Sequence, residues 1–122
     1  MAITYVEIED RYFVNPSDKN AIIVSVIIGN GQTGGYMIFL EKQFKSANKP
    51  ANLKTAAALA GKRCLISATI VDMLDETNWT SIIVKVQNGQ DTKQYGPYSK
   101  EAAMHLDTVS YAISIHFENE QV

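Results

Sequence analysis

The clearest strand pattern in the sequence is Val109-Ser-Tyr-Ala-Ile-Ser-Ile-His-Phe117, near the end of the chain. Large apolar side chains occupy every second position, and small or polar side chains lie between them. Because successive side chains of a β-strand point to opposite faces, this alternation predicts a strand with one buried and one wet face.

Weaker versions of the pattern predict further strands over residues 4–8, 21–28, 35–41, 63–73, 81–86 and 92–95. Residues 11–14 either continue the first of these strands or form a separate one. The run 21–28 is apolar on both faces, as in a central strand covered on two sides. In the strand at 63–73, Cys64 is in phase with Ile66 and Ala68, which predicts a buried thiol.

Turn residues predict how these strands connect. Four glycines over 29–35 predict a flexible loop closing a hairpin, and the polar residues 75–78 predict a second hairpin between 63–73 and 81–86. Residues 43–52 resemble a surface loop, and Asn52 is a suitable cap for a short helix over 53–60. Ser99 starts a second turn or short helix that runs through Leu106.

Composition supports a chain built mainly from strands. Ile and Val together number 22, against 6 Leu, and β-branched residues favour pleated, half-buried surfaces. We therefore predict an all-β fold: a single antiparallel β-sandwich domain over 1–122, immunoglobulin-like or jelly-roll-like, with about seven strands and one or two short helical segments. A flattened β-barrel is the alternative, because alternation alone does not separate the two.

Several classes of protein are excluded or disfavoured by composition. No run approaches the ~18 apolar residues of a membrane span, and the single cysteine excludes an internal disulfide. The chain opens without a secretory signal pattern, so a cytoplasmic protein is expected, with a secreted mature form left open. The net charge of −2 argues against a nucleic-acid partner, although the segment from Lys42 to Val71 holds six basic residues and no acidic one.

The residues capable of chemistry do not form a catalytic pattern. The glycines of 29–35 lack the Lys-Ser/Thr pair of a phosphate-binding loop, and His105 and His116 lack the spacing of a zinc site. No nucleophile-elbow sequence is present. We therefore expect no catalytic residues and no cofactor, and favour a protein that is not an enzyme.

The acidic turn is the best metal candidate. Asp72, Asp75 and Glu76, with Asn78, could supply hard oxygen ligands for calcium if a second acidic residue, Asp91 or Asp107, reached the same place. Solvated turn carboxylates are the simpler interpretation.

Aromatic residues carry the preferred functional hypothesis. Trp79 follows the acidic turn beside Asn78, and Tyr95 and Tyr98 bracket Gly96-Pro97. Trp and Tyr in loops offer large, rigid contact surfaces with a polar tip. We predict a non-enzymatic binding or assembly module that recognises a protein or glycan through Trp79, Tyr95, Tyr98 and Asn78, or through a sheet edge. A homodimer is compatible with such edges.

Two alternatives of other classes stay open. One is a calcium-dependent module that binds lipid or glycan through the Asp72–Asn78 turn. The other is a small barrel-type hydrolase or isomerase with a pocket inside a barrel.

Overall fold

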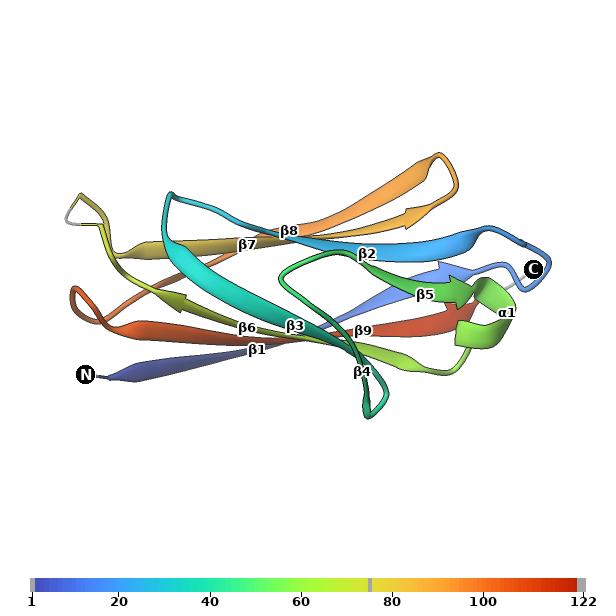
Figure 1. The fold of residues 1–122 in the computed structure, drawn as a ribbon, viewed down its shortest axis with the longest axis horizontal. Helices are drawn as coiled ribbons and strands as arrows, with labels where there is room; N and C mark the ends of the chain where they lie inside the picture. Colours follow the sequence, from blue (N-terminus) through green and yellow to red (C-terminus); the bar gives the residue numbers. More distant parts are fainter. Residues whose placement is uncertain (1, 75, 121–122) are drawn as a thin grey trace.

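Two β-sheets pack face to face and form a sandwich, as Figure 1 shows. The structure is a computed structural model and describes residues 2–74 and 76–120. The predicted all-β sandwich is confirmed. The two sheets do not close into a barrel, so the flattened-barrel alternative is wrong.

The sheets contain nine strands in the described residues. The five-stranded sheet has the order β1 (Ile3–Val14), β9 (Thr108–Asn119), β6 (Arg63–Val71), β3 (Thr33–Leu40) and β4 (Gln43–Ala47). The four-stranded sheet has the order β5 (Ala51–Thr55), β2 (Ala21–Ile28), β7 (Trp79–Asn88) and β8 (Asp91–Glu101). Neighbouring strands are antiparallel except β1 and β9, the first and last strands, which are parallel.

Two strands, β4 and β5, lie where the sequence predicted a surface loop and the start of a helix. In β5, Ala51 and Leu53 are buried while Asn52 and Lys54 are exposed, so the period-two pattern is present but short. The helix α1 is limited to Ala56–Leu59. The Oδ1 of Asn52 accepts a hydrogen bond from the backbone N–H of Lys54 and does not cap that helix.

Two predicted hairpins are instead crossings between the sheets. β2 lies in the four-stranded sheet and β3 in the other, and the same holds for β7 and β6. A sandwich needs such crossings, and turn residues alone do not distinguish them from hairpins. β8 continues through Glu101 and is followed by a turn, so the described residues contain no second helix.

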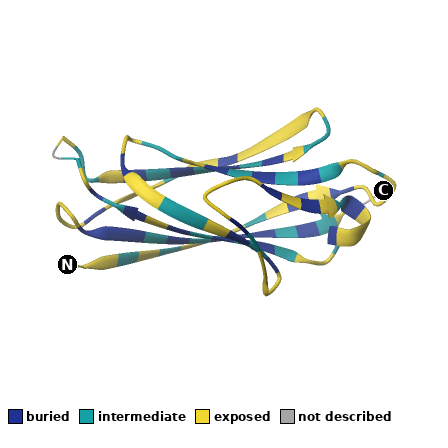
Figure 2. Ribbon diagram, in the orientation of Figure 1, coloured by how far each residue is buried: buried dark blue, intermediate teal, exposed yellow. Residues whose placement is uncertain are grey.

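The core lies between the sheets and consists of the inward positions of the alternating strands, drawn dark blue in Figure 2. The five apolar residues that defined β9 are buried, as are Cys64, Ile66, Ala68 and Ile70 of β6. β2 is central in its sheet but covered on one face only: Ile22 and Val24 are buried, whereas Ile27 is exposed on the other side. Burying one Ile or Val side chain contributes about 1.5–3 kcal/mol, so these strands supply most of the stability.

Candidate functional site

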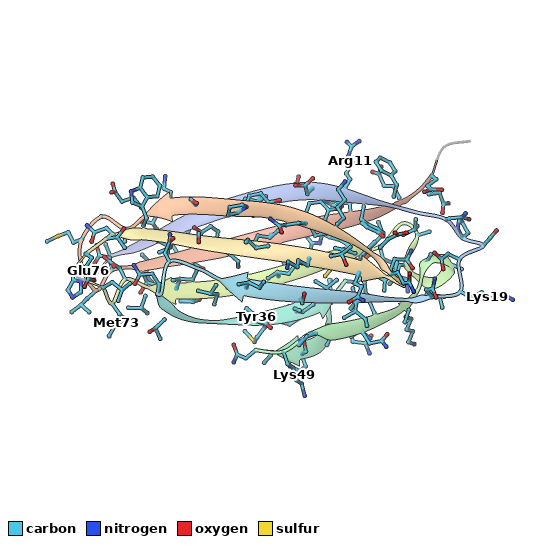
Figure 3. The ribbon with its side chains drawn as sticks, turned by 90° about the horizontal axis from the view of Figure 1, so that it is seen from above. Arg11, Lys19, Tyr36, Lys49, Met73 and Glu76 are labelled. Carbon is cyan, nitrogen blue, oxygen red and sulfur yellow. The ribbon has the colours of Figure 1, made fainter. Side chains whose placement is uncertain are left out.

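Three loops meet at one end of the sandwich, the end at which the chain begins (Figure 1, left). We call this the loop end and define it by residues 29–32, 72–78 without residue 75, and 102–107. Each loop crosses from one sheet to the other, which brings the β2–β3, β6–β7 and β8–β9 connections together. Figure 3 shows Met73 and Glu76 at this end.

A buried glutamine fixes the shape of the β6–β7 loop. The Nε2 of Gln32 lies 2.9 Å from Asp72 Oδ1 and 3.2 Å from the carbonyl oxygen of Trp79. Its Oε1 accepts a hydrogen bond of 2.9 Å from the backbone N–H of Met73. One side chain therefore satisfies backbone and carboxylate groups that would otherwise be buried without partners.

Two aspartates connect this loop to its neighbour. The backbone N–H of Asp72 donates to the carbonyl of Asp107, and the N–H of Leu106 donates to the carbonyl of Asp72. The carboxylate of Asp107 accepts hydrogen bonds from the backbone N–H groups of Ala2 and Met104. These acidic residues hold backbone together, and Asp72 is fully buried.

Trp79 and Asn78, two of the predicted binding residues, lie together at the loop end. Trp79 begins β7 and is 47% exposed, while Asn78 is half-buried. The backbone N–H of Ala102 donates a 2.7 Å hydrogen bond to the carbonyl of Asn78 and joins this segment to the β8–β9 loop. Hydrogen bonds therefore hold the backbone on both sides of the indole, at the carbonyl of Asn78 and at the carbonyl of Trp79.

Exposed apolar side chains also occur in the loops next to this tryptophan. Ten large hydrophobic side chains are exposed among the described residues, and four of them belong to the loops or strand starts of the loop end. We call these four the loop-end apolar cluster: Met73, Trp79, Met104 and Leu106. Beside them is an open hollow of about 330 Å³ lined by residues 104–107. Monomeric proteins rarely group exposed apolar side chains in one region, so these four residues are the candidate site of this subsection.

Sequence reasoning missed most of this cluster. Met104 and Leu106 fell in a segment assigned to a turn or short helix, and Gln32 fell among glycines. Their common location follows only from the three crossings between the sheets. Trp79 was the one signal visible in advance, because a tryptophan beside a polar turn is unusual.

Tyr95 and Tyr98 lie elsewhere, within β8 and opposite Val84 and Ile82 of β7. Tyr95 is buried, and its hydroxyl donates a 2.6 Å hydrogen bond to the carbonyl oxygen of Arg11 in β1. The Tyr98 hydroxyl donates a 2.7 Å hydrogen bond to Asp10 Oδ2. The structure thus separates these tyrosines from Trp79 and uses them to join the edges of the two sheets.

The environment of both tyrosines opposes ionisation. Burial raises the pKa of each hydroxyl above the ordinary value of 10.0, and the negative charge of Asp10 raises both further. For Tyr98, the hydrogen bond to Asp10 also favours the protonated hydroxyl.

The candidate calcium ligands converge in part. Asp107 reaches Asp72, whereas Asp91 pairs with Asn88 in the β7–β8 hairpin. Glu76 is exposed, and Asp75 lies outside the described residues. Over residues 2–74 and 76–120, no group of three or more His, Cys, Asp or Glu side chains is arranged to hold a metal ion.

The thiol and the imidazoles do not meet either. Cys64 is fully buried, as predicted, and burial raises the pKa of its thiol to about 12. His116, one strand away, points to the opposite face of the sheet, where its Nε2 lies 3.5 Å from Glu9 Oε1. His105 belongs to the loop end.

Comparisons with protein-family models, curated proteins and solved structures found no match for this chain. Within the described residues, none of the helical structure is long and apolar enough to cross a membrane.

Proposed function

We propose that this chain is a non-enzymatic binding module that holds a protein partner at the loop end. The observation that carries this proposal is the loop-end apolar cluster on loops braced by Gln32, Asp72 and Asp107. A loop backbone that is already ordered by these hydrogen bonds loses little conformational entropy on binding, so more of the contact energy becomes affinity.

The side chains favour a protein over a glycan as the partner. Glycan sites combine aromatic faces with several exposed hydrogen-bonding groups, whereas here the nearby carboxylates of Asp72 and Asp107 already bond within the protein. Methionine and leucine beside a tryptophan match the apolar anchors of protein interfaces, and flexible methionines adapt to irregular surfaces.

Site-specific photocrosslinking tests the proposal. A photoreactive phenylalanine analogue replaces Trp79 in one variant, Met104 in a second and, as a control, the exposed Lys19 at the opposite end of the molecule (Figure 3). In lysate from the source organism, positions 79 and 104 should crosslink to the same protein, identified by mass spectrometry, and position 19 should not. Identical products from all three positions would contradict the proposal, and so would the absence of any crosslinked product. Binding to a glycan array would instead support the glycan alternative.

One observation favours the calcium-dependent alternative as a second candidate. The Oδ2 of Asp72 is buried and has no hydrogen-bond partner among the described residues. A bound cation would satisfy this oxygen, with lipid or glycan as the further ligand. Thermal melts with and without calcium test this candidate. Calcium at ~100 times its dissociation constant should raise the free energy of unfolding by ~2.7 kcal/mol, and an unchanged melting temperature would rule the candidate out.

The hydrolase or isomerase alternative required a pocket inside a closed barrel. The sheets form an open sandwich with a packed core, so the described residues offer no barrel interior for such a pocket.

A further inference from the structure

The two long sides of the sandwich carry opposite charge. On one side is β1, with Glu7, Glu9 and Asp10, flanked by Glu118 and Glu120. We call this the acidic edge; Arg11, its one basic residue, lies 3.8 Å from Glu118. Figure 3 shows Arg11 and Lys49 on opposite long sides of the molecule.

The opposite side carries four lysines on or next to β4 and β5, which we call the basic edge: Lys42, Lys45, Lys49 and Lys54. Glu41 directly precedes Lys42, and its Oε1 accepts a hydrogen bond from the backbone N–H of Arg63. The basic segment noted in the sequence thus lies along one side of the fold, across the sheet from the acidic edge.

Exposed apolar side chains accompany both edges. Ile3, Tyr5 and Phe13 are exposed on β1, and Tyr5 is 75% exposed. Met37 of β3 and Phe44 of β4 are exposed at the other side. Each edge therefore pairs charge with apolar surface, a composition that an interface requires and a merely solubilising edge does not.

Strand directions allow the edges of two copies to meet. β9 runs parallel to β1, and each further step to β6, β3 and β4 reverses direction. β4 therefore runs opposite to β1. A second copy placed beside the first in the same orientation brings its β1 antiparallel to β4. This would extend the five-stranded sheet by antiparallel pairing along residues 3–9, before Asp10 and Arg11, which already bond to Tyr98 and Tyr95 of β8.

We propose that copies of this chain associate side by side, with the acidic edge of one against the basic edge of the next. The contact is heterologous, since it uses two different surfaces, so it leads to an open chain or a ring and not to a twofold dimer. It uses residues outside the loop end and does not depend on the proposed function. Opposite charges supply specificity, while like edges repel one another.

Sedimentation velocity on the full chain tests the proposal. Between ~10 μM and ~1 mM, the weight-average sedimentation coefficient should rise with concentration at low salt. The rise should be much smaller at about 1 M salt, where the Debye length is ~3 Å. A monomer at every concentration and salt condition would overturn the proposal, whether or not the loop end binds a partner.

Charge exchange gives the sharper test. The double variants Glu7→Lys/Glu9→Lys and Lys45→Glu/Lys49→Glu should each lower the association constant about tenfold or more, because each brings one of the two edges close to neutral and so removes the attraction between unlike edges. An equimolar mixture of the two should regain association, since each then offers the edge that the other needs. Association of either variant alone at the level of the unchanged protein would overturn the proposal, as would a mixture that stays monomeric.

Control variants carry charge changes of the same kind away from the two edges. Glu76→Lys and Lys19→Glu/Lys85→Glu alter exposed or half-exposed residues of turns and of β7, in the middle of the four-stranded sheet. They should associate as the unchanged protein does. If they weaken association as strongly as the edge variants, net charge and not edge complementarity is responsible, and the proposal fails. Thermal melts check that each variant is folded.

Discussion

At Gln32, one amide side chain serves several groups of the β6–β7 loop. It donates to Asp72 Oδ1 and accepts from the backbone of Met73, and it is almost completely buried. Such a residue contributes to stability mainly because its removal would leave its hydrogen-bond partners unsatisfied, with no water molecule in reach to replace it. It also links the core to the candidate site, since Trp79 follows the loop that it holds.

We expect Gln32→Ala to lower the free energy of unfolding by about 2–3 kcal/mol, because it leaves the buried Asp72 carboxylate without its donor and partly buried backbone groups without their partners. Urea denaturation measures this. The control Gln43→Ala, at an exposed position of β4, should change the free energy of unfolding by less than ~0.5 kcal/mol. Equal effects of the two substitutions would show that the network adds nothing.

The tyrosines of β8 lead to a pH prediction. The pKa of Tyr95 and Tyr98 is raised in the folded protein above the value of 10.0 that holds when the chain is unfolded. The unfolded state therefore loses these protons first as pH rises, and their contribution to stability, complete below pH 10, is lost as pH increases toward the folded pKa.

Two measurements follow from this linkage. Absorbance titration of the phenols should show a group of tyrosines that ionise above the ordinary range, and Tyr95→Phe and Tyr98→Phe should each remove one of them. The free energy of unfolding of the unchanged protein should fall above pH 10. Normal ionisation of both hydroxyls in the folded protein would contradict their burial beside Asp10.

Among the elements, predictability followed the length of the alternation. β9, β6 and β7 each present several large apolar residues at alternate positions, and the sequence located all three. β5 has only two buried positions, Ala51 and Leu53, between a proline and several lysines, so its local signals resemble a loop. Alternation also says nothing about which sheet a strand joins, so the β2–β3 and β6–β7 crossings were mistaken for hairpins.

The same limit applied to the site. Trp79 and Asn78 were predicted because Asn78 ends a polar turn and Trp79 follows it. Tyr95 and Tyr98 were assigned to a loop because Gly96-Pro97 resembles a break. The structure accommodates these two residues within β8, with a register shift opposite β7. Met104 and Leu106 carried no local signal, since exposure of an apolar residue depends on its neighbours in space.

The strand β5 provides a test at this scale. Leu53→Ala should lower the free energy of unfolding by about 2–5 kcal/mol, because Leu53 is fully buried. Phe44→Ala, on the neighbouring β4, removes a larger side chain that is mostly exposed and should cost clearly less. Chemical denaturation of both variants compares them. The reverse order would mean that Leu53 does not pack in the core as β5 places it.

For the whole molecule, the structure divides its tasks between regions. The apolar side chains packed between the two sheets provide stability. The loop end presents exposed apolar side chains on a hydrogen-bonded backbone, and the two long sides carry opposite charge. A molecule arranged in this way can bind one partner at its end while neighbouring copies contact its sides. Binding of a partner at the loop end requires that Trp79 contribute strongly to binding and only little to folding stability.

The most direct measurement is therefore made on Trp79→Ala with two readouts on the same sample. With the photoreactive analogue at position 104, the yield of the crosslinked partner should fall about tenfold or more, as at an interface hot spot. The free energy of unfolding should stay within about 1 kcal/mol of the unchanged protein. A large loss of stability, or an unchanged crosslinking yield, would contradict the account and place the indole in the core or outside the interface.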